Sequence, residues 1–214
     1  MGNIVLALNI IVCLAGIVKF RKLTMPFKLL AIWLIINLLL FYPLNKLCIS
    51  VYHNNMLWYH IQSAFEYCAY AIIYYHLFIN RRTRQIVLYS IPIIVIFSII
   101  NGCFFQPFTK AFPSYAVVSE EILCIIFGIL LFKQMLQYPV QINIVKQSVF
   151  WFNTSILFFS TAMFLIFSLM NYYATYKSKD IFMIAYFWYS VDIIFNILLF
   201  IAILNDNKRN TGKR

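Results

Sequence analysis

The sequence predicts an all-α, polytopic membrane helix bundle of seven transmembrane helices, with the N-terminus outside and the C-terminus in the cytoplasm. Composition is the first observation behind this prediction. The 214 residues are 64% hydrophobic and only 11% charged, whereas soluble domains average about 45–50% and about 25%. The other two observations are apolar runs long enough to span a bilayer and basic residues gathered between alternate runs. Lipid is the solvent for such a chain, because so few charges cannot cover so much apolar surface in water.

The apolar runs have the length of membrane helices, for which about 17–25 residues suffice. They are continuous rather than alternating, and this favours helices over the strands of a barrel. The first run is as short as a signal-peptide core, but it lacks a preceding basic region and a cleavage motif, so we expect it to stay in the mature protein. Residues 1–206 are expected to form one membrane domain, and residues 207–214 a short basic cytoplasmic tail. The predicted spans are residues 3–20, 27–44, 57–79, 86–106, 114–136, 147–172 and 181–204.

The lysines and arginines predict the orientation. Thirteen of the 17 fall in the connections after the first, third and fifth runs or in the tail, and four fall on the opposite side. Since cytoplasmic connections are enriched in Lys and Arg, the N-terminus is expected outside. Arg81, Arg82 and Arg84 form a compact cationic loop that we expect to contact lipid headgroups or a partner. The expected partners are the bilayer, a cytoplasmic or membrane signalling protein and a second copy of the chain, but no nucleic acid.

Four of the six acidic residues lie inside predicted spans: Glu66, Glu120, Glu121 and Asp192. A charged side chain at the centre of a bilayer costs at least about 2.5–3.5 kcal/mol, so such groups turn toward the interior of a bundle. At about 1.5 Å per residue, all four fall in the outer half of their helices. They predict a polar cavity nearer the outside.

Helical spacing places other polar side chains on the same faces as these acids. Hydrogen bonds between membrane helices also serve as packing contacts worth about 0.6 kcal/mol on average, and that alternative stays open for Asn153 and Asn196. Of the adjacent Glu120 and Glu121, at most one is expected to face the cavity squarely. The predicted pocket, for a small ligand or a proton, consists of Glu66, Asp192, Glu120, Glu121, His60, Gln62, Tyr70, Asn153 and Asn196.

Two further features concern the outer ends of the spans. Cys48 and Cys103 both lie there, so a disulfide between them is an alternative to separate thiols, which we favour. The aromatic side chains Tyr42, Trp58 and Tyr59 are expected to belong mostly to an interfacial belt, with the lining of a ligand entrance as the alternative for some of them.

Catalytic signatures such as G-x-S-x-G, H-E-x-x-H and a glycine-rich phosphate loop are absent from the sequence. The histidines and cysteines also lack the spacing of metal ligands. The pair Glu120–Glu121 is similar to the double glutamate of CPBP-type intramembrane proteases, but that family's following arginine and its histidine motifs are missing. We therefore expect no catalytic residues, no cofactor and no metal, and an intramembrane enzyme is the least favoured class.

Two stretches carry a resemblance to a known group of proteins: AFEYCAYAIIYYHLFINRRTRQ, and SVFWFNTSILFFSTAMFLIFSLMNYY with the closing FNILLFIAIL. They resemble small uncharacterised seven-helix membrane proteins of Bacteroidota-type bacteria. The resemblance implies a sensory or accessory protein of the bacterial inner membrane and supplies no site residues. The favoured function is a non-enzymatic, receptor-like protein with an outward polar cavity and a basic cytoplasmic face. The alternative is a proton- or cation-coupled carrier or channel that uses the intramembrane acids.

Overall fold

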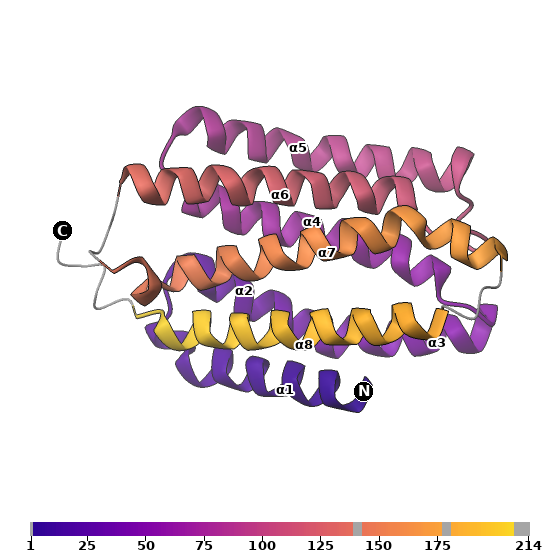
Figure 1. Cartoon of the computed structure of the whole chain (residues 1–214), viewed down its shortest axis with the longest axis horizontal. Coiled ribbons are helices and arrows are strands. Elements are labelled where there is room, and N and C mark those ends of the chain that lie inside the picture. Colours follow the sequence, from indigo (N-terminus) through magenta and orange to yellow (C-terminus); the bar gives the residue numbers. More distant parts are fainter. Residues whose placement is uncertain (1, 139–142, 177–180, 208–214) are drawn as a thin grey trace.

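The computed structural model of the chain describes residues 2–138, 143–176 and 181–207, without the side chains of 171–176 and 181–183. Regular structure in these residues is entirely helical (Figure 1). Two π-helical segments continue longer helices: η2 (Asn37–Phe41) joins α2 to α3, and η3 (Asn101–Phe105) extends α5. The α-helices are α1 (Gly2–Lys19), α2 (Met25–Ile36), α3 (Tyr42–Tyr52), α4 (Met56–Leu77), α5 (Arg81–Ile100), α6 (Ser114–Gln137), α7 (Ser148–Tyr176) and α8 (Ile181–Asn205).

Among the described residues, six helical segments are long and apolar enough to cross a membrane, so the chain is a multi-pass helical membrane protein. A seventh span was predicted at residues 57–79, where α4 is found. Its 22 residues would reach about 33 Å at 1.5 Å per residue, close to the thickness of the hydrocarbon core. It is not among the six apolar segments, because it carries polar side chains such as Gln62, Ser63 and Glu66. The six apolar segments are Gly2–Lys22, Met25–Tyr52, Arg81–Phe105, Ser114–Gln137, Ser148–Met170 and Ile184–Asn205.

Two of the predicted spans begin or end at the wrong place. The second was predicted to end at Leu44, but the helix continues to Tyr52 through η2. Pro43 does not stop it: the proline lies directly after the π-helical turn η2, in the first turn of α3. The fourth was predicted to begin at Ile86, but α5 begins at Arg81. The side chain of Asn80 accepts a hydrogen bond from the Arg82 N–H at 2.8 Å and caps the helix.

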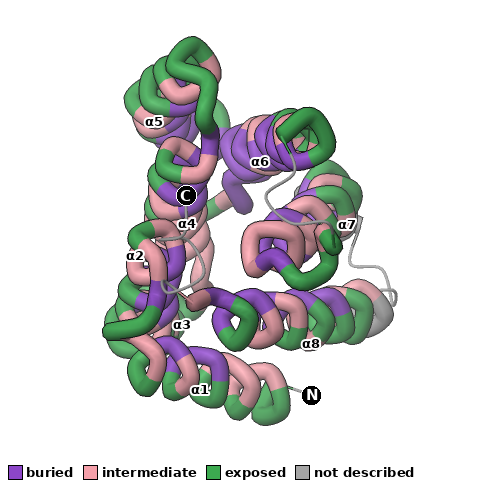
Figure 2. Tube along the Cα trace, turned by 90° about the vertical axis from the view of Figure 1, so that its left-hand side faces the viewer, coloured by how far each residue is buried: buried purple, intermediate pink, exposed green. Residues whose placement is uncertain are grey.

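Successive long helices run in opposite directions, so the bundle has two distinct ends (Figure 1). The basic end holds the last residues of α1, α4, α6 and α8. The cavity end holds the first residues of α1, α4, α6 and α8. Viewed along the bundle in Figure 2, α1 and α5 lie far apart, and the buried parts of the helices face one another. The described basic residues that were predicted on the cytoplasmic side therefore lie together at one end of the bundle.

Packed rings fill the half of the bundle nearer the basic end. The rings of Tyr74, Phe127 and Phe152 come from α4, α6 and α7, and all three are buried. The Tyr74 centroid lies 5.9 Å from that of Phe127 and 5.7 Å from that of Phe152. Phe27 of α2 meets Phe152 edge to face at 6.1 Å. Aromatic contacts of this kind add to the stability from apolar burial, and they close the bundle on this side.

At the basic end, polar bonds tie together the first, second, seventh and last helices. The Lys19 ammonium donates to backbone carbonyls at the end of α8, at 2.6 Å to the oxygen of Leu204. The Asp206 carboxylate accepts from the backbone N–H of Thr24 at 2.7 Å, at the start of α2, and from the Ser148 hydroxyl at 3.1 Å, at the start of α7. A cation at a helix C-terminus and an anion at a helix N-terminus both stabilise the helix. We call these contacts the Lys19–Asp206 clasp.

Candidate functional site

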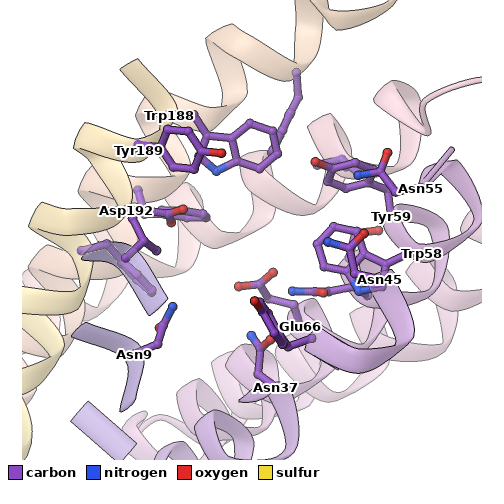
Figure 3. A pocket seen from close by; sticks show the side chains of 18 of the residues that line it. Asn9, Asn37, Asn45, Asn55, Trp58, Tyr59, Glu66, Trp188, Tyr189 and Asp192 are labelled. Carbon is purple, nitrogen blue, oxygen red and sulfur yellow. The ribbon is translucent and has the colours of Figure 1, made fainter. Parts of the chain in front are cut away.

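A cavity of about 720 Å³ lies in the half of the bundle nearer the cavity end. Every long helix except α5 contributes side chains to its wall. Four of these side chains are acids, and we call the space the acid cavity. Figure 3 shows Glu66 on one side and Asp192 across the cavity from it, with labelled asparagine and aromatic side chains around both. The described wall does not extend past Tyr70 of α4, and the packed rings around Tyr74 begin one turn farther on.

The four acids reach the acid cavity from three helices: α4, α6 and α8. Glu66 Oε1 accepts a hydrogen bond from the Tyr70 hydroxyl, one turn along α4, at 2.7 Å. Glu120 is only 5% exposed and its Oε1 accepts from the Ser98 hydroxyl of α5 at 3.2 Å. Glu120 and Glu121 both line the cavity, although only one was expected to face it squarely. Glu120 lies deeper against α5, whereas Glu121 is partly exposed.

Seven of the nine residues predicted for the pocket line the acid cavity: Glu66, Asp192, Glu120, Glu121, Gln62, Tyr70 and Asn196. The other two lie outside the wall. His60 Nε2 is 3.2 Å from the Ala111 carbonyl, and its ring packs on Phe108 at 4.8 Å, so it faces the α5–α6 connection. Asn153 lies nearer the basic end, where it donates to the Gly128 carbonyl and accepts from the Tyr74 hydroxyl. Both side chains have partners in the protein framework.

Asparagines from the first helices form a wall that sequence reasoning missed. Asn9 of α1, Asn37 of η2, Asn45 of α3 and Asn55 before α4 all line the acid cavity (Figure 3). Asn9 and Asn37 each stand alone in an apolar run, and an amide costs far less to place in a membrane helix than a carboxylate does. In the sequence, this wall is visible only as a recurrence of Asn in the outer halves of the first two spans and before the third.

Several polar atoms of the wall have no hydrogen-bond partner among the described residues. These are the side-chain oxygens of Asn45, Gln62, Ser63 and Asn196 and the indole nitrogen Nε1 of Trp33. Asn196 is 3% exposed and Trp33 5%. A buried polar group without a partner costs about 1–3 kcal/mol. The residues of the wall thus hold four oxygens and one indole N–H that a polar guest in contact with these atoms would satisfy.

The described lining of the acid cavity contains no lysine, arginine or histidine. Residue 1 and the connection 177–180, with Lys177 and Lys179, lie outside the described residues. Within the described part of the chain, no group of three His, Cys, Asp or Glu side chains is placed to hold a metal ion. The cavity is therefore acidic in character, and its carboxyl groups are spread over its wall.

Aromatic rings cover the part of the acid cavity nearest the cavity end. The rings of Trp58 and Tyr59 on α4 meet at 4.6 Å, and Tyr59 lies 5.9 Å from Trp188 of α8. The Trp58 indole donates to the carbonyl of Phe41 at 2.9 Å and is thereby held in place. Tyr42, Trp58 and Tyr59, which were expected in an interfacial belt, all line the cavity.

The cationic loop predicted to meet a partner lies at the basic end. Arg81 and Arg82 are exposed there. Arg84 is partly buried, and its guanidinium group lies 4.3 Å from the centroid of the Tyr75 ring. A guanidinium group over an aromatic ring is a favourable cation–π contact. Arg84 thus belongs in part to the protein framework, while the other two arginines face outward.

The five cysteines are all free thiols. Cys48 is buried on α3 and Cys103 is exposed on η3. Separate thiols, which we favoured over a disulfide, are what the structure contains.

No protein-family model, curated protein or solved structure matches the chain. The resemblance to seven-helix proteins of Bacteroidota-type bacteria gains no support from these comparisons. What the helices and their composition establish is a multi-pass helical membrane protein.

Proposed function

We propose that the protein is a non-enzymatic, receptor-like membrane protein that binds a small molecule in the acid cavity. In this proposal all seven long helices cross the bilayer, with the cavity end outside the cell. The membrane is the bacterial inner membrane, as the resemblance of the sequence implies. The observation that carries the proposal is the gathering of four carboxyl side chains from α4, α6 and α8 around one cavity.

The size and the closed base of the acid cavity support binding rather than passage. Ligand pockets in proteins span about 300–1,000 Å³, and this cavity measures about 720 Å³. Between it and the basic end lie the buried rings of Tyr74, Phe127 and Phe152. A solute would have to displace these rings to reach the opposite side of the bundle. Unpartnered polar atoms in the wall also favour a polar ligand, because pairing them removes their desolvation penalty.

The basic end supplies the surface for a signalling partner. Arg81 and Arg82 are exposed beside the start of α5, and the sequence places four more basic residues in the tail from Lys208 onward. Such clusters attract anionic lipid headgroups and acidic protein surfaces.

A carrier is the second candidate function, and the π-helical segments favour it. Irregular turns of this kind often occur at functional sites. One of them, η2, contributes Asn37 to the wall of the acid cavity. In a carrier these segments would be hinges around which the helices rearrange, and the packed rings would separate during transport.

Filling the acid cavity tests the proposed function. Ala185 lines the cavity, whereas Ala7 is exposed on α1 and does not. We expect a screen of small polar molecules to yield at least one that raises the unfolding temperature of the purified protein saturably. The variant Ala185→Trp should lose this shift, and the matched control Ala7→Trp should keep it. Equal shifts in wild type and Ala185→Trp would contradict binding in the cavity.

Transport is measured separately in proteoliposomes. The receptor proposal predicts no flux of the bound molecule or of protons above that of empty liposomes. Flux that disappears in Glu66→Gln would replace the receptor with the carrier.

A further inference from the structure

We propose that the ligand of the acid cavity is a small organic ammonium ion that carries N–H groups and is anchored by Asp192. This inference rests on the proposed function and adds the chemical class of the ligand. It follows from the sign of the charge in the cavity, from the polar atoms that lack partners and from the rings beside Asp192.

Charge favours a cation. Glu66, Glu120, Glu121 and Asp192 line the acid cavity, and the described lining has no basic side chain to balance them. Ionised groups held away from bulk water need an opposite charge or hydrogen-bond donors. An anionic ligand would be repelled by each carboxylate that carries charge, whereas an ammonium group would pair with it.

The unpartnered atoms favour a ligand with N–H donors. The side-chain oxygens of Asn45, Gln62 and Asn196 are buried acceptors, and none has a donor among the described residues. Asn196 is one turn along α8 from Asp192, and its amide nitrogen donates to the Asp192 carbonyl at 2.8 Å. The bond is to the backbone of Asp192, and the side chains of both residues line the acid cavity. The unpartnered donors of the wall, Trp33 Nε1 and the Ser63 hydroxyl, call for an acceptor elsewhere on the ligand, such as a hydroxyl group.

The surroundings of Asp192 favour an organic ammonium over a metal ion. Trp188 and Tyr189 precede Asp192 by about one turn of α8, and Figure 3 shows all three on the same side of the cavity. Tyr59 faces them from α4, 5.9 Å from Trp188 between ring centroids. Aromatic faces attract organic ammonium groups within about 6 Å. The volume of the cavity and the absence of a metal-ligand cluster in the described residues do not fit a bare ion.

Three compounds with the same phenol ring and different end groups test the class of ligand. Tyramine ends in an ammonium group, tyrosol in a hydroxyl group and 4-hydroxyphenylacetate in a carboxylate. The full-length protein is purified in micelles and its thermal unfolding is followed with each compound and with a series of other primary amines. We expect saturable stabilisation by tyramine or another amine, and none by the alcohol or the acid. Trimethylation of the amine should weaken binding, because it removes the N–H donors.

Variants assign the anchor. Asp192→Asn keeps the shape of the side chain and removes its charge, and we expect about a tenfold or greater loss of amine affinity. Asp206→Asn makes the same change at the basic end and should leave the affinity unchanged. If Asp192→Asn does not fold, Glu66→Gln removes a charge from the same cavity and should weaken amine binding as well.

The outcomes separate this inference from the proposed function. Binding of tyrosol or 4-hydroxyphenylacetate as tight as that of the best amine would overturn the ammonium class and leave a small-molecule receptor intact. The ammonium class would also be overturned, and the receptor kept, if no amine in the series binds but the wider screen finds another ligand that Ala185→Trp excludes. Amine binding that persists undiminished in Ala185→Trp would overturn both.

Discussion

Replacing Asn153 by leucine tests whether this residue belongs to the protein framework or to the pocket, for which it was first predicted. Its side chain is fully buried and joins three helices: it donates to the Gly128 carbonyl of α6 at 2.9 Å and accepts from the Tyr74 hydroxyl of α4 at 3.0 Å. Hydrogen bonds between membrane helices contribute about 0.6 kcal/mol on average and at most about 1.7. Leaving a buried partner unpaired adds about 1–3 kcal/mol. For Asn153→Leu we expect a loss of about 2 kcal/mol in the free energy of unfolding.

The assay is unfolding of the purified protein in mixed micelles with rising amounts of sodium dodecyl sulfate. Ser155 provides a matched control, because it is equally buried on α7 but bonds only to the Phe152 carbonyl of its own helix at 2.7 Å. Ser155→Ala should change the stability by about 0.6 kcal/mol or less. The reasoning is refuted if Asn153→Leu is as stable as the control and loses ligand affinity, since Asn153 would then act in binding.

Two other predictions concern stability. Asp206→Ala removes the carboxylate acceptor of the Lys19–Asp206 clasp, and we expect the free energy of unfolding to fall by about 2–4 kcal/mol in the same assay. Asp206→Asn should cause a smaller loss. Equal stability of wild type and Asp206→Ala would show that the clasp contributes nothing. Gly102→Ala would place a methyl group in a clash with ring atoms of Phe108, so we expect a loss of about 1–3 kcal/mol from overpacking. The control Gly2→Ala should be neutral, because its added methyl group would lie 3.7 Å from the Tyr189 hydroxyl oxygen. Unchanged stability of Gly102→Ala would mean that the Phe108 ring moves aside freely.

The helices were predictable because apolar runs of spanning length are direct consequences of the lipid environment. Their ends were harder to predict where features other than hydrophobicity, such as a capping side chain, determine where the helix begins or ends. The helix that contains Pro43 continues past Lys46 to Tyr52 although its polarity rises. At α5, the Asn80 cap starts the helix in a basic segment that a search for apolar residues passes over.

The acids of the cavity were predictable because a carboxyl group inside a membrane helix is expensive and must turn inward. Asn9, Asn37 and Asn45 were missed because cheaper amides stand out only once neighbouring helices are known. Asn153 was predicted in the pocket but lies outside its wall, again because the neighbours of its helix were not known. A long helix such as α7 meets different neighbours along its length, so the face that borders the cavity in one half packs against Gly128 and Tyr74 in the other.

Thiol labelling at the wall of the acid cavity tests most directly whether this cavity is reached from outside the cell. In a chain with its five cysteines replaced, Gln62→Cys would place a thiol in the wall, and Thr83→Cys would place one at the basic end. With a membrane-impermeant maleimide, the account predicts that intact cells label Gln62→Cys, that inverted vesicles label Thr83→Cys, and that a bound ligand slows the first reaction. Labelling of Gln62→Cys only from the cytoplasmic side, or from neither side, would contradict the account.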